Sequence, residues 1–413
     1  MIKNVKQKHL ITIAITTVLL VSACGESTSS SSGEGYADQQ PIETGFDEQA
    51  LIANLVDNVI SPTFDRFVDE SNEQTQLVDA YCQAEQSFAD GLSDASAVAQ
   101  AKDAAREGWK VAMSTWQQAE TMLLGPLLEN DNLLRNNIYS WPIVNSCAVD
   151  YDVMFFQTGE VNGSPYDITK RTSSRKGLAA LEYLLFNDDL ATSCESAGPD
   201  GWHNQSESYR KIARCQFAVE VALDIHNNAN DLVFAWSNVG GYAEQLKTAG
   251  SANSVFNSEH EAVNRISDAM FYLDKSTKDG KLAEPLGLLV NECGTGACVE
   301  AVESRYAQQS ISHIINNLIG FDRLLTGDNG TGFVDFLINN DASEVADDMT
   351  SDVQTAISGA QAYQQSLSTT LIENREQVVQ THTDIKAITD KLKTDFINNL
   401  ALELPKTSAG DND

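Results

Sequence analysis

Apolar residues recur at every third or fourth position along most of the chain. Three such sets are Leu51, Ile52, Leu55, Val56, Val59 and Ile60; Ile311, Ile314, Ile315, Leu318 and Leu325; and Ile385, Ile388, Leu392, Phe396 and Leu400. This period gives a helix one apolar face and predicts amphipathic α-helices. Alternating segments bounded by turn residues, the mark of strands, are hard to find. We therefore predict an all-α protein.

A single amphipathic helix cannot bury its apolar face alone, so these helices should pack as antiparallel bundles. The 413 residues are enough for two bundles joined side by side. A small, polar stretch from Gly240 to Asn257 marks the softest boundary. We predict an N-terminal bundle over residues 45–240, a C-terminal bundle over residues 241–405 and a polar tail over residues 406–413.

The first residues carry a targeting signal. Three lysines precede the apolar stretch Leu10–Val21, which is too short to span a bilayer comfortably as a mature helix. It ends in Val-Ser-Ala before Cys24, a pattern that resembles the lipobox of bacterial lipoproteins. We predict a signal peptide over residues 1–23, a lipid anchor on Cys24 and a flexible Ser/Gly-rich tether over residues 24–44. Gly25 after the cysteine favours the outer membrane, with the protein facing the periplasm; a plain secretory signal is the alternative.

The chain has a formal net charge of -32. Such a charge makes nucleic acid and anionic lipid head groups unsuitable partners. An acidic surface attracts cations, although solubility or salt adaptation explains it as well. Charge alone identifies no ligand.

Six cysteines follow Cys24, and an even count in an exported chain suggests disulfides. The short segment "CGTGAC" can close as Cys293–Cys298, and a Cys194–Cys215 bridge would staple the loop between those residues. Cys82 and Cys147 would then form the third pair. The cysteines lack CxxC spacing and nearby histidines, so a metal site is a weak alternative.

The sequence does not match the common catalytic motifs. The segment "HEAVN" begins at His260 like a zinc-protease helix but has Asn264 where the second histidine belongs. There is no GxSxG, GxGxxG or phosphate-binding loop in the sequence. The segment 327–332, "GDNGTG", lacks the spaced acids of a calcium loop, and each of the scattered histidines is best explained as a satisfied or solvated side chain.

The apolar run "RKGLAALEYLLF" (residues 175–186) contains one acid, Glu182. A buried, unpaired carboxylate costs several kcal/mol, so this acid needs compensation or has a function. One interpretation is structural, with Glu182 paired to Arg175, Lys176 or Arg305. The other is that Glu182 belongs to a ligand site.

Five segments together resemble the imelysin-like family, which is also called peptidase family M75. They are "AREGWKVAMSTWQQAETMLLGP" (105–126), "IYSWPIV" (138–144), "RKGLAALEYLLF", "KLAEPLGL" (281–288) and "VESRYAQQSISHIINNLIGFDRLLTG" (302–327). The resemblance covers roughly residues 45 to 400. It implies two related helical bundles in an envelope protein, a site near their junction, a link to iron uptake and, for some members, a claimed peptidase activity.

The family's hallmark is GxHxxE, whose histidine and glutamate lie three residues apart on one helix face and could share a metal. This sequence has Gly177 and Glu182 at the ends of that motif but Ala179 in place of the histidine. One carboxylate is a poor site for iron or another divalent metal without further ligands. The candidate binding residues are Glu182, Gly177, Glu120, Trp141, Arg175, Glu303 and Arg305, with Glu182 as the metal ligand; Trp141 is also explained as a core residue.

Three functions remain open. The first is a non-enzymatic lipoprotein that binds a metal, a metal chelate or a small ligand at the interdomain cleft, in iron uptake. The second is a scaffold for an outer-membrane receptor, in which Glu182 is structural. The third is a metallopeptidase, which has the least support because the motif lacks its histidine and no nucleophile with a matching base is visible. We favour the first.

Overall fold

The structure is a computed structural model that describes residues 45–195, 198–406 and 408. Its N-terminal half contains α1 (Glu48–Asn54), η2 (Leu55–Ile60), α2 (Ser61–Ala89), α3 (Ala95–Ala119), η3 (Glu120–Met122), η4 (Gly125–Leu127), α4 (Glu129–Ile138), α5 (Ser146–Thr158), β1 (Glu160–Val161), β2 (Ser164–Pro165), η5 (Ile168–Lys170), η6 (Ser173–Arg175), α6 (Gly177–Phe186), η7 (Trp202–Asn204), α7 (Glu207–Ser237) and α8 (Tyr242–Lys247).

The C-terminal half contains α9 (Glu259–Met270), η8 (Leu273–Ala283), α10 (Glu284–Leu286), α11 (Ser310–Thr326), α12 (Phe333–Asn339), α13 (Ser343–Gln361), α14 (Leu367–Glu373), α15 (Arg375–Lys391), η9 (Leu392–Phe396) and α16 (Ile397–Leu400). The segments η2, η8 and η9 are π-helical, and the other η segments are 3₁₀ turns. The strands β1 and β2 form one short antiparallel pair. The predicted all-α fold is confirmed.

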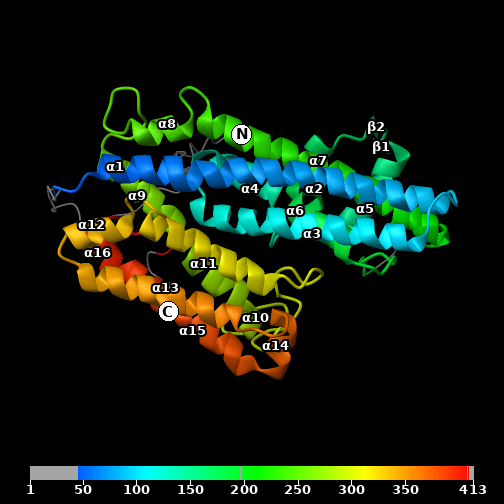
Figure 1. Cartoon of the computed structure of the whole chain (residues 1–413). Helices are drawn as coiled ribbons and strands as arrows, with labels where there is room; N and C mark the ends of the chain where they lie inside the picture. The colour runs from blue at the N-terminus through cyan, green and yellow to red at the C-terminus, as the bar shows by residue number, and fades with distance from the viewer. Residues whose placement is uncertain (1–44, 196–197, 407, 409–413) are drawn as a thin grey trace, which may run out of the picture.

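The helices form two packed groups, seen above and below one another in Figure 1. In the first group α2 packs against α3 and α7, and α6 packs against α3 and α7. In the second group α13 packs against α11 and α15, and α15 packs against η8. Helix α11 also packs against α3, so these two helices lie at the junction of the two groups. Most of the apolar positions predicted from the sequence belong to one continuous hydrophobic core that extends through both groups.

Polar side chains define where several of these helices begin. Asp94 accepts a hydrogen bond from the Ala97 N–H at the start of α3, and Ser206 does the same for Tyr209 in α7. Such N-caps satisfy donors that have no partner inside the helix. These caps fix the residue at which α3 and α7 begin.

The described residues contain the disulfides Cys82–Cys215, Cys147–Cys194 and Cys293–Cys298. The predicted Cys293–Cys298 bridge is confirmed. The predicted Cys194–Cys215 and Cys82–Cys147 pairs are wrong. Cys82 lies on α2 and Cys215 on α7, which pack against each other, so helix packing joins cysteines that are distant in sequence.

The predicted signal peptide, Cys24 and the tether lie outside the described residues. Among the helices that the structure does describe, none has the length and apolar character needed to cross a membrane.

Candidate functional site

Helix α6 carries Glu182 and begins at a glycine for a steric reason. Gly177 has a φ of +80°, and a Cβ there would lie 2.8 Å from the carbonyl oxygens of Asn137 and Ile138. A side chain is disfavoured by both the backbone conformation and the close approach. Gly177 therefore lets the start of α6 pack directly on the end of α4, and its role is structural.

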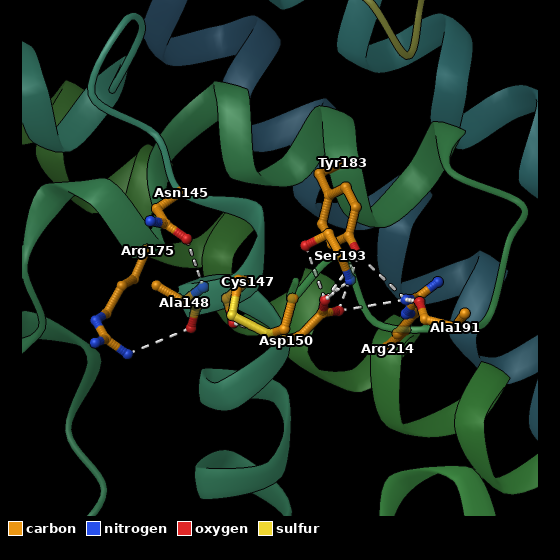
Figure 2. Close-up of a disulfide and its surroundings, with 10 residues drawn as sticks. Asn145, Cys147, Ala148, Asp150, Arg175, Tyr183, Ala191, Ser193 and Arg214 are labelled. Atoms are coloured by element: carbon orange, nitrogen blue, oxygen red, sulfur yellow. Dashed lines mark hydrogen bonds and ion pairs between the residues drawn. A yellow bond between two sulfur atoms is a disulfide. The ribbon is translucent and has the colours of Figure 1, made fainter. Parts of the chain in front are cut away.

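Helix α6 is also fixed on two other sides. The indole N–H of Trp109 on α3 donates to the Leu178 carbonyl at 2.9 Å. The Tyr183 hydroxyl donates to both oxygens of Asp150 on α5, at 3.0 and 2.9 Å, and Arg214 lies 3.3 Å from the same carboxylate, as Figure 2 shows. Because Tyr183 follows Glu182, these contacts set the orientation of Glu182.

The Cys147–Cys194 disulfide beside this cluster, also seen in Figure 2, ties the segment after α6 to the start of α5. The Ser193 N–H donates to Asp150 at 2.7 Å in the same place. The start of α6 is therefore held by packing on α4 and by the Trp109 hydrogen bond, and the segment after α6 is held by the disulfide and the Ser193 hydrogen bond. These contacts fix the position of the helix that carries Glu182.

A cleft of about 350 Å³ lies between the two halves of the molecule, and Glu182 and Ala179 of α6 line it. Aromatic side chains also line the cleft, namely Tyr139, Trp141 and Tyr306. Its remaining charged residues are Glu284, Glu292, Glu300 and Arg305. Burial and the neighbouring Glu292 raise the pKa of Glu284, as expected where acids gather. The cleft thus combines aromatic walls with four carboxyl groups and one guanidinium.

Glu182 is held by neutral donors. Its Oε1 accepts hydrogen bonds from the backbone N–H groups of Tyr306 and Ala307, at 3.0 and 2.9 Å, and from the Ser304 hydroxyl at 3.2 Å. Its Oε2 has no hydrogen-bond partner among the described residues. The side chain is only 4% exposed, so one oxygen is anchored and the other is available to a ligand in the cleft.

Burial raises the pKa of Glu182 to about 7. The N–H groups of Ala307 and Tyr306 and the Ser304 hydroxyl act in the opposite direction, and the charge of Glu303 adds to the increase. Three dipoles compensate a buried charge less fully than an opposite charge would. Glu182 therefore changes its charge near neutral pH.

Glu303 lies in a different environment on the same segment. It is 1% exposed, accepts a 2.5 Å hydrogen bond from the Tyr139 hydroxyl and lies 3.2 Å from the Lys281 ammonium. His313 Nδ1 lies 3.1 Å from its second oxygen. Burial tends to raise the pKa of Glu303, but Lys281 and His313 outweigh this effect, and the pKa falls to about 2.

Lys281 connects this carboxylate to further polar groups. Its Nζ donates to Gln117 Oε1 at 2.5 Å and to Asn317 Oδ1 at 2.7 Å, so α3, η8 and α11 meet at one ammonium group. We call Glu303, Lys281, His313 and Tyr139 the junction network.

Glu120 also proves to be structural. It is fully buried, and Arg135 donates to both of its oxygens, at 3.0 and 2.5 Å. The same guanidinium donates to the Trp141 carbonyl at 2.9 Å. Glu120 therefore positions the aromatic wall of the cleft through Arg135 and does not line the cleft itself. The peptide bond that follows Trp141 is cis.

None of the three basic residues considered as partners of Glu182 contacts it. Arg175 pairs with Asp152 at 2.8 Å, and the Lys176 Nζ lies 3.2 Å from Asp224. Arg305 lines the cleft, but its guanidinium contacts the Tyr306 hydroxyl and ring. The ion pair, one of the two interpretations of Glu182, does not form, because the loop after Glu303 turns its backbone N–H groups toward Glu182 instead.

The residues around Glu182 do not form a chelating metal centre. Ala179 lines the cleft beside Glu182 without a donor atom, while Glu120 and Glu303 are engaged with Arg135 and Lys281. In the described part of the chain, the one group of three metal-ligating side chains is Cys293, Cys298 and Glu300, whose two sulfurs are joined in a disulfide. A metal ion bound to Glu182 would have to keep most of its own ligands.

Sequence reasoning missed the backbone donors Tyr306 and Ala307 and the roles of Lys281 and Ser304. Lys281 and Ser304 stand inside the segments that carry the family resemblance, which is a signal of importance but not of contact. The backbone donors have no residue signature, because any residue supplies an N–H group. Ser304, at a φ of +53°, turns the chain at this point.

The architecture is that of a two-bundle helical protein with an acidic cleft between the bundles. The sequence model of the Imelysin family, peptidase family M75, matches residues 60–394, and the chain therefore belongs to this family. The family resemblance seen in the sequence is confirmed. That Ala179 stands in place of the histidine of the GxHxxE motif stays a prediction from the sequence.

Two solved structures share the fold. An imelysin-like protein from Psychrobacter arcticum has a TM-score of 0.63 at 14% identity and covers 88% of this chain and 98% of its own. A protein from Parabacteroides distasonis described as an iron-regulated protein A precursor has a TM-score of 0.63 at 17% identity, covering 87% and 97%. In sequence, iron-regulated protein A of Synechococcus elongatus is 23% identical over 292 residues, which are 69% of this chain and 67% of that protein.

Proposed function

We propose that this protein is a non-enzymatic, lipid-anchored protein of the cell envelope that binds a cation in the cleft beside Glu182, in an iron-related role. The single observation that carries the proposal is the Glu182 carboxylate, anchored through Oε1 and open at Oε2 in a cleft with three further acids. The lipobox-like sequence before Cys24 supports the anchor, and the names of two similar proteins support the link to iron.

The donor set favours a divalent metal ion that keeps its water or a chelating ligand. A free Oε2 supplies one bond, and the rim acids Glu284, Glu292 and Glu300 supply charge rather than a preformed coordination shell. A hydrated Fe²⁺ ion meets both conditions. The same donor set argues against a peptidase, because the cleft does not present the three protein ligands that a catalytic zinc ion takes.

Titration calorimetry with Fe²⁺ under anaerobic conditions, and with Zn²⁺ in parallel, tests the proposal. We expect binding to the wild type to strengthen as the pH rises through about 7, because the ionised form of Glu182 attracts a cation. Glu182→Gln retains the shape of the side chain and an acceptor for the three anchoring donors. It should lose the pH-dependent binding.

Glu373→Gln is the matched control, since it removes the same charge from an exposed position on α14 that does not line the cleft. It should bind as the wild type does. Equal binding by the wild type and Glu182→Gln at pH 8 would overturn the proposal, and degradation of casein by the pure protein would overturn its non-enzymatic part.

A further inference from the structure

The Cys293–Cys298 disulfide differs from the other two in its place in the molecule. It closes a loop with a sequence separation of 5, whereas the other two join residues separated by 133 and 47. A cross-link over so short a loop removes little freedom from the unfolded chain and so stabilises the fold least. Cys293 is also exposed, while Cys82 and Cys215 are buried between α2 and α7.

The loop keeps its shape through contacts that do not involve sulfur. The Asn291 side-chain amide donates to the carbonyls of Glu284 and Gly296, at 2.7 and 2.9 Å, and its oxygen accepts from the Cys293 N–H at 2.9 Å. The Cys298 N–H donates to the Pro285 carbonyl at 2.8 Å. The two cysteines should therefore stay close together when the bond between them is broken.

Gly287 adds a second restraint on the same loop. It has a φ of +74°, and a Cβ there would lie 2.5 Å from the Gly296 carbonyl oxygen. The absence of a side chain thus lets the loop backbone pack directly on the residue after α10. This contact does not involve the sulfur atoms.

A carboxylate lies against both sulfurs. Glu300 Oε2 is 3.5 Å from Cys293 Sγ and 3.5 Å from Cys298 Sγ, and the three potential ligand atoms lie within 4.8 Å of one another. Two thiolates and a carboxylate at this spacing would repel one another, and a divalent cation between them removes that repulsion. Two sulfur ligands select a borderline or soft metal such as Zn²⁺ over Ca²⁺ or Mg²⁺.

We propose that Cys293, Cys298 and Glu300 form a redox-gated zinc site, closed by the disulfide and opened by a dithiol reductant. In the opening step the dithiol attacks the exposed Cys293 sulfur, the S–S bond breaks, and two electrons and two protons pass to the cysteines while the reductant becomes a disulfide. Zn²⁺ then binds both sulfurs and Glu300 with release of the two thiol protons, and its fourth position stays open. Glu300 also lies at the rim of the cleft, but Glu182 is not a ligand of this site, and the site does not depend on the proposed function.

The test uses the full chain, reduced with a small dithiol, freed of reductant without air and titrated with Zn²⁺ by calorimetry. We expect reduction to create one additional zinc site per chain. Cys293→Ser should abolish it, and Glu300→Gln should weaken it by on the order of tenfold or more, through loss of one ligand. Titration of the reduced protein with Cd²⁺ should give ultraviolet thiolate-to-metal absorption at the same stoichiometry.

Two variants separate this site from others in the molecule. Cys147→Ser/Cys194→Ser removes a different disulfide pair and should keep the additional site, and reduced Glu182→Gln should keep it as well. The proposal is overturned if reduced wild type takes up no more Zn²⁺ than reduced Cys293→Ser. It is also overturned if the additional site disappears in Glu182→Gln, which would place the metal in the cleft.

Discussion

Glu182 and Glu303 are both buried at the junction of the two halves, yet their surroundings shift their pKa values in opposite directions. Glu182 accepts three neutral hydrogen bonds and its pKa rises to about 7, whereas Glu303 lies against Lys281 and His313 and its pKa falls to about 2. Depth of burial alone does not determine whether an acid is protonated at a given pH. The charge of the groups that replace water around it also determines its pKa.

The two carboxylates also differ in their capacity to bind a ligand. Glu303 Oε1 contacts the Tyr139 hydroxyl and the Lys281 ammonium, and Oε2 faces His313, so Glu303 links three parts of the chain at the junction. Glu182 keeps one oxygen without a partner in the described residues and lines the cleft. Ser304 follows Glu303 directly and donates a hydrogen bond to Glu182. One short segment therefore carries Glu303 and also a donor to Glu182.

Glu303→Gln should destabilise the folded protein strongly. This variant leaves the Lys281 ammonium buried without an anion, and we expect the free energy of unfolding at pH 7 to fall by about 3–5 kcal/mol. Urea denaturation followed by circular dichroism measures it. The double variant Glu303→Gln/Lys281→Met removes both charges and should recover much of the loss; a single variant as stable as the wild type would contradict the assignment of the junction network.

The second effect is a change in how stability depends on pH, in Glu182→Gln. The pKa of Glu182 is about 7 in the folded protein and close to its ordinary value in the unfolded chain, so the folded state binds more protons between them. The contribution of Glu182 to stability therefore decreases as the pH rises from about 5 to 7. The opposite holds for Glu303, whose contribution is present above its ordinary pKa and is lost as the pH falls toward 2.

Glu182→Gln should thus gain stability over the wild type as the pH increases, from near zero at pH 5 to as much as ~3 kcal/mol at pH 8. Denaturant unfolding at a series of pH values measures the difference between the two proteins. A difference that stays constant across this range would show that Glu182 does not titrate near neutrality, and Glu182 would then resemble Glu303 rather than contrast with it.

The two carboxylates also show what the sequence reveals. Helical periodicity predicted the fold class because it is a local property of each segment, and the residues around Glu182 and Glu303 stood out as segments similar to a family. The sequence did not identify the groups that form hydrogen bonds and ion pairs with each acid. Lys281 reaches Glu303 because η8 packs beside α11, and no spacing along the chain encodes that contact.

The disulfides illustrate the same limit. Cys293–Cys298 was predictable because a short Gly-containing loop closes on itself. Cys82–Cys215 was not, since it depends on which turns of α2 and α7 face each other. Glu182 was recognised as an acid in need of compensation, but the compensation comes from backbone N–H groups more than a hundred residues away. Local rules predict the elements, and tertiary packing decides their partners.

Ser304→Ala removes a single hydrogen bond to Glu182. Loss of the 3.2 Å hydroxyl contact should cost about 1 kcal/mol or less, since the two backbone donors remain. The hydroxyl lowers the pKa of Glu182, so its removal should raise that pKa further and shift the onset of Fe²⁺ binding to higher pH.

Ser146→Ala is the matched control for this change. Ser146 also lines the cleft, but its hydroxyl lies 3.3 Å from the Tyr306 hydroxyl and does not contact Glu182. Calorimetric titrations between pH 6 and 8 should show the shift in Ser304→Ala alone. If both variants shift equally, the pKa of Glu182 responds to the general polarity of the cleft, and the contrast with Glu303 does not depend on the identity of individual donors.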